Sequence, residues 1–190
     1  MKNLRLELEE IIIHRPKKRW QLYFIVVSDH PSKKDKMVIT IIPDNLIQLK
    51  PLSNNRLIFE AKGQGTDGFL LLKTPMPKDR KFNVRFFLRH SRENTRNLGK
   101  ILSDMKSELG ADAFEIISKV YKTNTPGLEI AKKALPLLGN IIQKIKDRDL
   151  GMINMYEEFG DEFDNQIELD RENKTSTGEA TVIWSWSIDE

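Results

Sequence analysis

The sequence predicts a mainly β protein of the α+β class, an antiparallel β-sandwich of about 8 to 10 strands that carries an insertion of three helices. Apolar residues recur with a period of two up to about residue 90, with a helical period over residues 92–148, and again with a period of two after Gly151. We therefore expect one domain, 1–190, in which residues 1–91 and 149–190 form the sandwich and residues 92–148 form the helical insertion.

The first half of the chain has the pattern of successive short strands. Leucines at positions 4, 6 and 8 alternate with charged residues and lead into three isoleucines, which predicts a strand with one buried face. Residues 20–27 are aromatic and β-branched enough for a central strand. The other predicted strands are 37–42, 45–49, 56–61, 68–73 and 82–89, with turns at 43–44, 53–55, 63–68 and 75–77.

Three helices are predicted next. Residues 94–109 place apolar side chains on one face and end at Gly110, a residue that tolerates a left-handed helix terminus. Asp112 is a suitable cap for a short second helix, and Thr125 followed by Pro126 begins a third. The third helix is apolar enough to be buried against the sandwich, with a partner-facing or membrane-surface role as the alternative.

The strand pattern returns in the last forty or so residues. Val182, Trp184 and Trp186 alternate with other residues near the C-terminus, as in a strand with one apolar face. Strands are predicted over 152–159, 166–169 and 179–188.

Composition excludes several classes of site. The chain of 190 residues has no cysteine, which removes disulfides, thiolate metal sites and cysteine nucleophiles. The N-terminus is charged throughout and lacks a signal-peptide core, and the longest apolar window, 134–142, is too short to cross a bilayer. We expect no transmembrane segment and a cytoplasmic location, at the periphery of a membrane or a larger assembly where the chain has such a partner.

Charge is divided unevenly along the chain. Residues 1–100 hold 21 Lys and Arg against 10 Asp and Glu, a net charge of +11, whereas residues 101–190 hold 10 against 18, a net charge of −8. This polarity predicts docking to a protein partner or self-association, unless folding brings the two halves together. Nucleic acid is not an expected partner, because the acidic half repels phosphate.

A basic set of residues follows the strand near residue 85. Strand alternation places Lys81, Arg85 and Arg89 on one face together with Phe87. A basic face with an aromatic ring suits phosphate, in lipid head groups or nucleic acid, and equally suits pairing with the chain's own acidic segment. The predicted partner- or phosphate-binding residues are Lys81, Arg85, Phe87, Arg89, Arg92 and Arg96.

An acidic set lies in the second half. Residues 157–172 hold eight carboxylates and a single base, Arg171. Paired carboxylates can bind a hard cation or act as general acid and base, but the spacing is not that of a calcium loop, so an acidic face for a basic partner is favoured. The predicted acidic docking residues are Glu157, Glu158, Asp161, Glu162 and Asp164.

Other motifs give no catalytic or metal site. Residues 63–68 match the dinucleotide pattern G-x-G-x-x-G, but Gly68 opens an apolar strand-like run instead of a helix, which favours a glycine-rich hairpin connection. His14, His30 and His90 lack metal-ligand spacing. We therefore expect no cofactor, no metal and no catalytic residues.

The sequence leaves three functions open. The favoured one is a non-enzymatic β-sandwich interaction module that docks to a protein partner or self-assembles through opposed basic and acidic surfaces. The first alternative is peripheral binding to anionic lipid, with or without calcium, because the layout is similar in general terms to calcium- and lipid-binding sandwich domains. The second is a hydrolase that uses the acidic segment 157–172.

Overall fold

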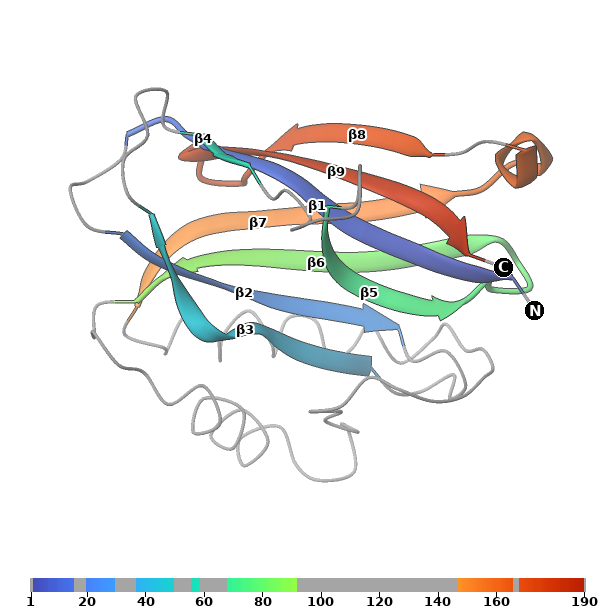
Figure 1. Cartoon of the computed structure of the whole chain (residues 1–190), viewed down its shortest axis with the longest axis horizontal. Coiled ribbons are helices and arrows are strands. Elements are labelled where there is room, and N and C mark those ends of the chain that lie inside the picture. Colours follow the sequence, from blue (N-terminus) through green and yellow to red (C-terminus); the bar gives the residue numbers. More distant parts are fainter. Residues whose placement is uncertain are drawn as a thin grey trace.

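Two antiparallel β-sheets face each other in the computed structural model (Figure 1), which describes residues 2–15, 20–29, 37–49, 56–58, 68–91, 147–165 and 168–189. Short connections, residues 76–80 and 175–179, join β5 to β6 and β8 to β9. The elements are β1 (Asn3–Ile13), β2 (Trp20–Asp29), β3 (Met37–Leu49), β4 (Arg56–Ile58), β5 (Phe69–Pro75), β6 (Lys81–His90), β7 (Arg148–Glu158), the 3-10 helix η1 (Asp161–Asn165), β8 (Leu169–Lys174) and β9 (Ala180–Asp189).

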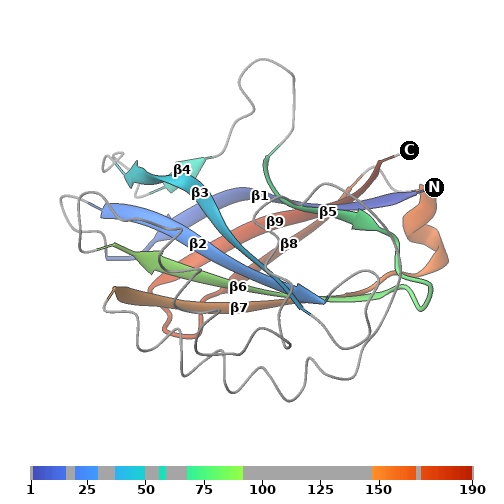
Figure 2. The same cartoon turned by 90° about the horizontal axis from the view of Figure 1, so that it is seen from below.

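Sheet A has the strand order β4-β1-β9-β8, and β5 also pairs with β1. The strands β4 and β5 share one edge of β1, because β4 pairs with Glu10–Ile12 and β5 with Asn3–Leu8. Sheet B has the order β3-β2-β6-β7. In the view of Figure 2 the strands of the two sheets overlap, and each sheet contains strands from both the N-terminal and the C-terminal parts of the chain.

The predicted α+β class is corrected by this structure. Strands make up 73% of the described residues, and no α-helix occurs among them, so this part of the chain is nearly all β. The three helices were predicted from the apolar spacing in residues 92–148. Residues 92–146 lie outside the described residues, Arg148 begins strand β7, and the described sandwich carries no three-helix insertion. The β-rich character that the sequence predicts is confirmed. None of the described residues belongs to a helix with the length and apolar character that crossing a bilayer requires.

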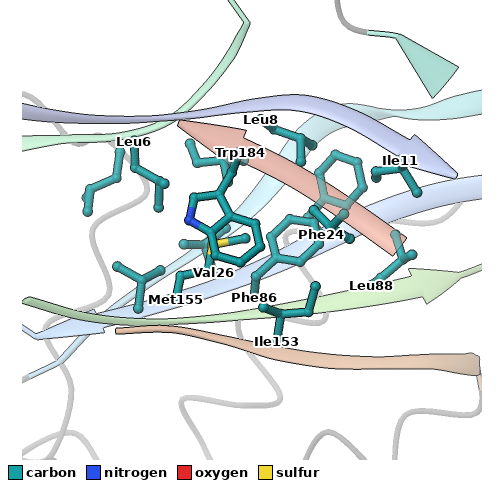
Figure 3. Close-up of a cluster of buried hydrophobic side chains, with 14 of the residues drawn as sticks. Leu6, Leu8, Ile11, Phe24, Val26, Phe86, Leu88, Ile153, Met155 and Trp184 are labelled. Atoms are coloured by element: carbon teal, nitrogen blue, oxygen red, sulfur yellow. The ribbon is translucent and has the colours of Figure 1, made fainter. Parts of the chain in front are cut away.

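The apolar core lies between the sheets. Alternate residues of β1 point to it from sheet A and alternate residues of β6 from sheet B, as the period of two predicts. Figure 3 shows side chains from both sheets meeting, with Trp184 among them. Phe24 and Phe86 stack with their ring centroids 5.0 Å apart, and Trp186 packs edge-on against Phe159 at 5.4 Å.

Strand β2 is buried on both of its faces. Leu22, Phe24 and Val26 belong to the core between the sheets, while Tyr23 and Ile25 point the other way and are equally inaccessible to solvent. The run of aromatic and β-branched residues predicts this central position, since a strand with one wet face would alternate with polar residues. The outer face of sheet B is therefore a buried surface where β2 lies.

Two strand predictions were wrong. Residues 37–49 form the single strand β3, not two strands with a turn at Pro43. Leu22 pairs with Ile47 and Phe24 with Ile42, so the extra β3 residues form an irregularity at the sheet edge, where proline is tolerated. Of the strand expected over 166–169, residues 166–167 lie outside the described residues, residue 168 is not in a strand, and β8 begins at Leu169.

A β-bulge in β1 changes which residues point outward. Leu8 pairs with Trp184 but Glu10 pairs with Ile183, so Glu9 has no direct partner on β9. Gly68 packs against the bulge: a Cβ atom at this position would lie 2.7 Å from the Leu8 carbonyl oxygen and 2.6 Å from Glu9 Oε1. Gly68 thus opens strand β5 in close contact with β1, as expected for a glycine before a strand and unlike a nucleotide-binding loop.

The hairpin between β8 and β9 closes one side of the sandwich. Its turn residue Ser176 donates its backbone N–H to the Met152 carbonyl on β7, and the Thr177 hydroxyl donates to the Leu150 carbonyl at 2.6 Å. Gly151 lies between these two β7 residues with φ of +104°, and a Cβ atom there would lie 2.7 Å from Thr175 Cβ. We call this contact the β7–hairpin seam.

The replacement Gly151→Ala tests the seam. We expect it to lower the free energy of unfolding by about 2 to 4 kcal/mol, since it adds a side chain at positive φ and against Thr175. Gly178→Ala is the matched control: Gly178 has φ of +70° but open space around its Cβ position, so only the backbone cost of about 1 kcal/mol applies. Urea unfolding of the two variants measures the difference, and equal losses would contradict the seam.

Candidate functional site

Lys81, the first residue of the predicted basic set, is paired within the chain. Its Nζ atom lies 2.8 Å from Oε1 of Glu158, a residue of the predicted acidic set, because β6 and β7 are neighbours and place the two side by side. The hydrogen bond between them raises the pKa of Lys81 and lowers that of Glu158. Both side chains remain exposed, so solvent and salt screen the attraction.

Arg85 lies half-buried on the outer face of sheet B, near the end of β2. Desolvation lowers the pKa of its guanidinium, and the charge of Asp29 opposes that change. Burial also disfavours the charged form of Asp29 and raises its pKa to about 6, although the positive charge of Arg85 lowers that pKa. The negative charge of Asp79 raises the pKa of Asp29 as well. The charges of Arg85 and Asp29 thus interact within the chain, in a poorly solvated place.

Arg89 is buried, with 1% of its surface exposed. One Nη atom donates to the Asp147 carbonyl at 3.0 Å and the other lies 3.2 Å from Asp149 Oδ1. The Tyr23 hydroxyl donates to Asp147 Oδ2 at 2.6 Å, which joins β2, β6 and the start of β7 in one polar cluster. A guanidinium held in this way is structural and is not presented to a surface.

The predicted basic set is thus only partly assembled. Phe87 is half-buried opposite Met152 on β7, while Arg92 and Arg96 lie outside the described residues. The lipid-binding alternative depends on Arg85, Arg89 and the predicted helical insertion, of which residues 92–146 lie outside the described residues. Arg85 interacts with the charge of Asp29, and Arg89 forms an ion pair with Asp149. This geometry gives that alternative no support.

Three of the predicted acidic docking residues are also in ion pairs. Glu157 on β7 accepts two hydrogen bonds from Arg171 of β8, at 2.8 and 3.0 Å, and this bidentate pair joins the two sheets beside the seam. Glu158 pairs with Lys81. Asp164 pairs with Arg80 at 2.9 Å and with Lys2 at 3.0 Å. These hydrogen bonds lower the pKa of Asp164.

Asp161 and Glu162 differ from the other acidic residues. Both are exposed on η1, where Phe163 alone among the five helix residues points into the core. Their charges help to raise the pKa of Arg80. The hydrolase alternative needs two carboxyl groups directed at a shared substrate, whereas the carboxylates of residues 157–164 are in ion pairs or exposed on η1.

The sequence did not predict a second acidic surface, on the outer face of sheet A. Glu9 of β1 accepts a hydrogen bond from the Ser185 hydroxyl of β9 at 2.8 Å. Its pKa is raised by burial and by the negative charges of Glu168, Glu7 and Asp170, although the Ser185 bond opposes this. We call these four carboxylates, Glu7, Glu9, Glu168 and Asp170, the sheet A acidic face. Glu7 is buried and forms an ion pair with Arg5, so the accessible part of the face consists of the other three.

One signal for this face was present in the sequence. The leucines of β1 alternate regularly up to Leu8, but Glu9 and Glu10 are adjacent and shift the phase before Ile11, which indicates a bulge. Asp170 of β8 is on the same sheet as Glu9 of β1, with β9 between them. This arrangement depends on the pairing of β9 with both strands, which no local sequence pattern predicts.

The described histidines have polar partners and no metal-like grouping. His14 Nε2 lies 2.9 Å from Thr181 Oγ1, and His90 Nδ1 contacts the backbone of Gln21. His30 lies outside the described residues. Within the parts of the chain that the structure describes, no three His, Asp or Glu side chains are grouped to hold a metal ion.

Asp29 gives a prediction on pH dependence. Its pKa of about 6 exceeds that of an unfolded aspartate, so the folded state binds more protons between about pH 4 and 6, and stability from this group falls as the pH rises through that window. Asp29→Asn should therefore raise the unfolding free energy at pH 7 by about 1 to 3 kcal/mol, with the gain vanishing below about pH 4. Asp161→Asn, on exposed η1, is the control for urea unfolding at several pH values; equal behaviour of the two variants would refute the assignment.

The Glu157–Arg171 pair gives a second prediction. In a double-mutant cycle with Glu157→Gln and Arg171→Gln, we expect a coupling energy of about 0.5 to 1 kcal/mol, because the contact is bidentate and Glu157 is mostly buried. The same cycle on Lys81 and Glu158 should give a smaller value that disappears sooner with added salt, since both partners are exposed. A larger coupling energy for Lys81–Glu158 than for Glu157–Arg171 would contradict the expectation that burial and bidentate geometry strengthen the latter pair.

The charged residues that the structure describes thus include internal ion pairs, exposed carboxylates such as Asp161, and the sheet A acidic face. The chain matches no known protein-family model, and no curated protein sequence is significantly similar to it. A function for this protein therefore has to be inferred from its own residues and their geometry.

Proposed function

We propose that this chain is a non-enzymatic β-sandwich interaction module that docks to a basic surface, on a protein partner or on a second copy of itself. The observation that carries the proposal is the sheet A acidic face. Burial is the main cause of the raised pKa of Glu9 on β1, and the negative charges of Glu168 and Asp170, at the start of β8, add to it. The repulsion among these charges is removed when a cationic group from a partner enters the cluster.

The location of the face supports docking. It lies on the outer surface of a sheet, where Glu168 and Asp170 are exposed, and Ser185 and Glu9 form a polar centre between the two strands. Of the predicted basic and acidic sets, by contrast, Lys81 and Glu158 pair with each other, and Arg89, Glu157 and Asp164 pair with other residues of the chain. The sheet A acidic face therefore replaces those sets as the favoured docking surface.

A lysine-rich peptide tests the proposal. We expect deca-lysine to bind the protein in calorimetric titrations, with an affinity that falls as salt is raised. Charge reversal by Glu168→Lys together with Asp170→Lys should weaken binding about tenfold or more. The control, Asp161→Lys with Glu162→Lys, makes the same change in net charge on η1 and should cost much less.

Equal losses in the two double variants would contradict the proposal, because net charge alone would then explain the binding. Absence of any binding at low salt would contradict it as well. Circular dichroism of each variant checks that the sandwich remains folded, which is expected because all four positions are exposed.

A further inference from the structure

The strand β8 is an open edge of sheet A. Among the described strands it pairs with β9 alone, and Figure 1 shows it along the border of the sheet. Asp170, Glu172, Asn173 and Lys174 are all exposed, so the folded chain leaves this edge accessible. An exposed strand edge carries backbone donors and acceptors that another strand can use.

The hydrogen bonds of the hairpin show which residues face the edge. Thr175 donates its backbone N–H to the Ala180 carbonyl, so in the antiparallel ladder every second residue before Thr175 bonds to β9. The residues between them, Asp170, Glu172 and Lys174, direct their N–H and C=O groups away from β9 and towards the open side.

Side chains of β8 occupy two of these edge groups. The Lys174 N–H donates to Oδ1 of Asn173 at 2.8 Å, and an Nη atom of Arg171 donates to the Asp170 carbonyl at 3.0 Å. Both contacts are exposed to solvent, so exchanging them for bonds to a neighbouring strand has a small net cost. They are contacts of the type that a strand partner would supply at this edge.

We propose that β8 pairs antiparallel with β8 of a second copy of this chain, about a two-fold axis through Asn173. In this register Glu172 of each copy lies opposite Lys174 of the other. Both are residues whose backbone groups face the edge, so each Glu172–Lys174 pair combines backbone hydrogen bonds with opposite charges on one face of the joined sheet. The inference rests on the proposed function, of which it is the self-assembly form.

Charge complementarity selects this register from its neighbours. A two-fold axis through Glu172 would place the two Glu172 side chains opposite each other, and one through Lys174 would do the same for the two lysines. An axis through Arg171 would oppose two arginines and also set Asp170 against Glu172. An axis through Asn173 is the one register of this group that avoids like charges.

Sedimentation at low salt over a concentration series tests the pairing. We expect a monomer–dimer equilibrium for the unmodified chain. Lys174→Glu should weaken dimerisation about tenfold or more, because both cross-strand pairs become repulsive. The swapped double variant, Glu172→Lys with Lys174→Glu, restores opposite charges in the same register and should recover the dimer.

A single cysteine tests the axis without relying on charge. The chain has no cysteine, so Asn173→Cys introduces its only thiol, at the position where the two copies meet. Directly opposed residues of a non-hydrogen-bonded antiparallel pair are close enough for a disulfide. Under mild oxidation we expect rapid formation of a covalent dimer, which adding Lys174→Glu suppresses. Asn154→Cys, exposed on β7, is the matched control.

The outcomes separate this inference from the proposed function. A monomer at every concentration, with Asn173→Cys crosslinking no faster than Asn154→Cys, overturns the β8 pairing, while deca-lysine binding tests the acidic face independently. A dimer that is unaffected by Lys174→Glu overturns the β8 register and assigns self-association to another surface. Loss by Lys174→Glu, recovery in the swapped variant and a crosslink at Asn173 together establish it.

Discussion

The β7–hairpin seam is the contact on which the rest of the described structure depends. It ties β7 of sheet B to the turn between β8 and β9 of sheet A through the Thr177 hydroxyl and the backbone of Ser176. With the turn fixed, Arg148 makes a bidentate contact with Glu179, at 2.8 and 2.9 Å, on one side of it, and Arg171 reaches Glu157 further along β7. The same contacts occupy backbone groups of β7 that would otherwise form an open sheet edge. One glycine with a left-handed backbone makes this close approach sterically feasible.

This architecture changes the meaning of the uneven charge along the sequence. The basic first half supplies Lys2, Arg80 and Lys81 to carboxylates of the acidic second half, so folding neutralises much of the polarity. The sheet A acidic face contains residues from both halves, since Glu9 comes from the basic half of the sequence and Asp170 from the acidic half. Charge separation in sequence and charge separation in space are therefore different properties of this protein, connected only through the strand pairing.

Sequence periodicity accounts for most of the strands but for little of the candidate site. Alternation in β6 identified which residues face the core, and the continuous apolar run of β2 indicated a central strand. The burial of Arg89 did not follow, because its alternation with Phe86 and Leu88 suggests an outward residue. It lies opposite Tyr23 on a face of sheet B that is itself buried, and this is evident only once the register between β2 and β6 is known. The irregularity at Pro43 and the acidic face at the β1 bulge likewise depend on pairings between distant segments.

The open edge of β8 and the acidic face beside it are physically coupled. If the edge residues of β8 all had the same charge, two copies would repel each other in every register. Because Glu172 and Lys174 have opposite charges, the register with its axis through Asn173 is attractive, and the neighbouring registers place like charges opposite each other. Pairing of two β8 strands would also join two acidic faces into one continuous surface, because Asp170 belongs to both features. Repulsion between the two faces weakens the dimer, and cationic groups that neutralise the faces would strengthen it. By thermodynamic linkage, a basic partner that binds the joined surface more tightly than the single one must favour assembly by the same factor, so docking and self-association would act together.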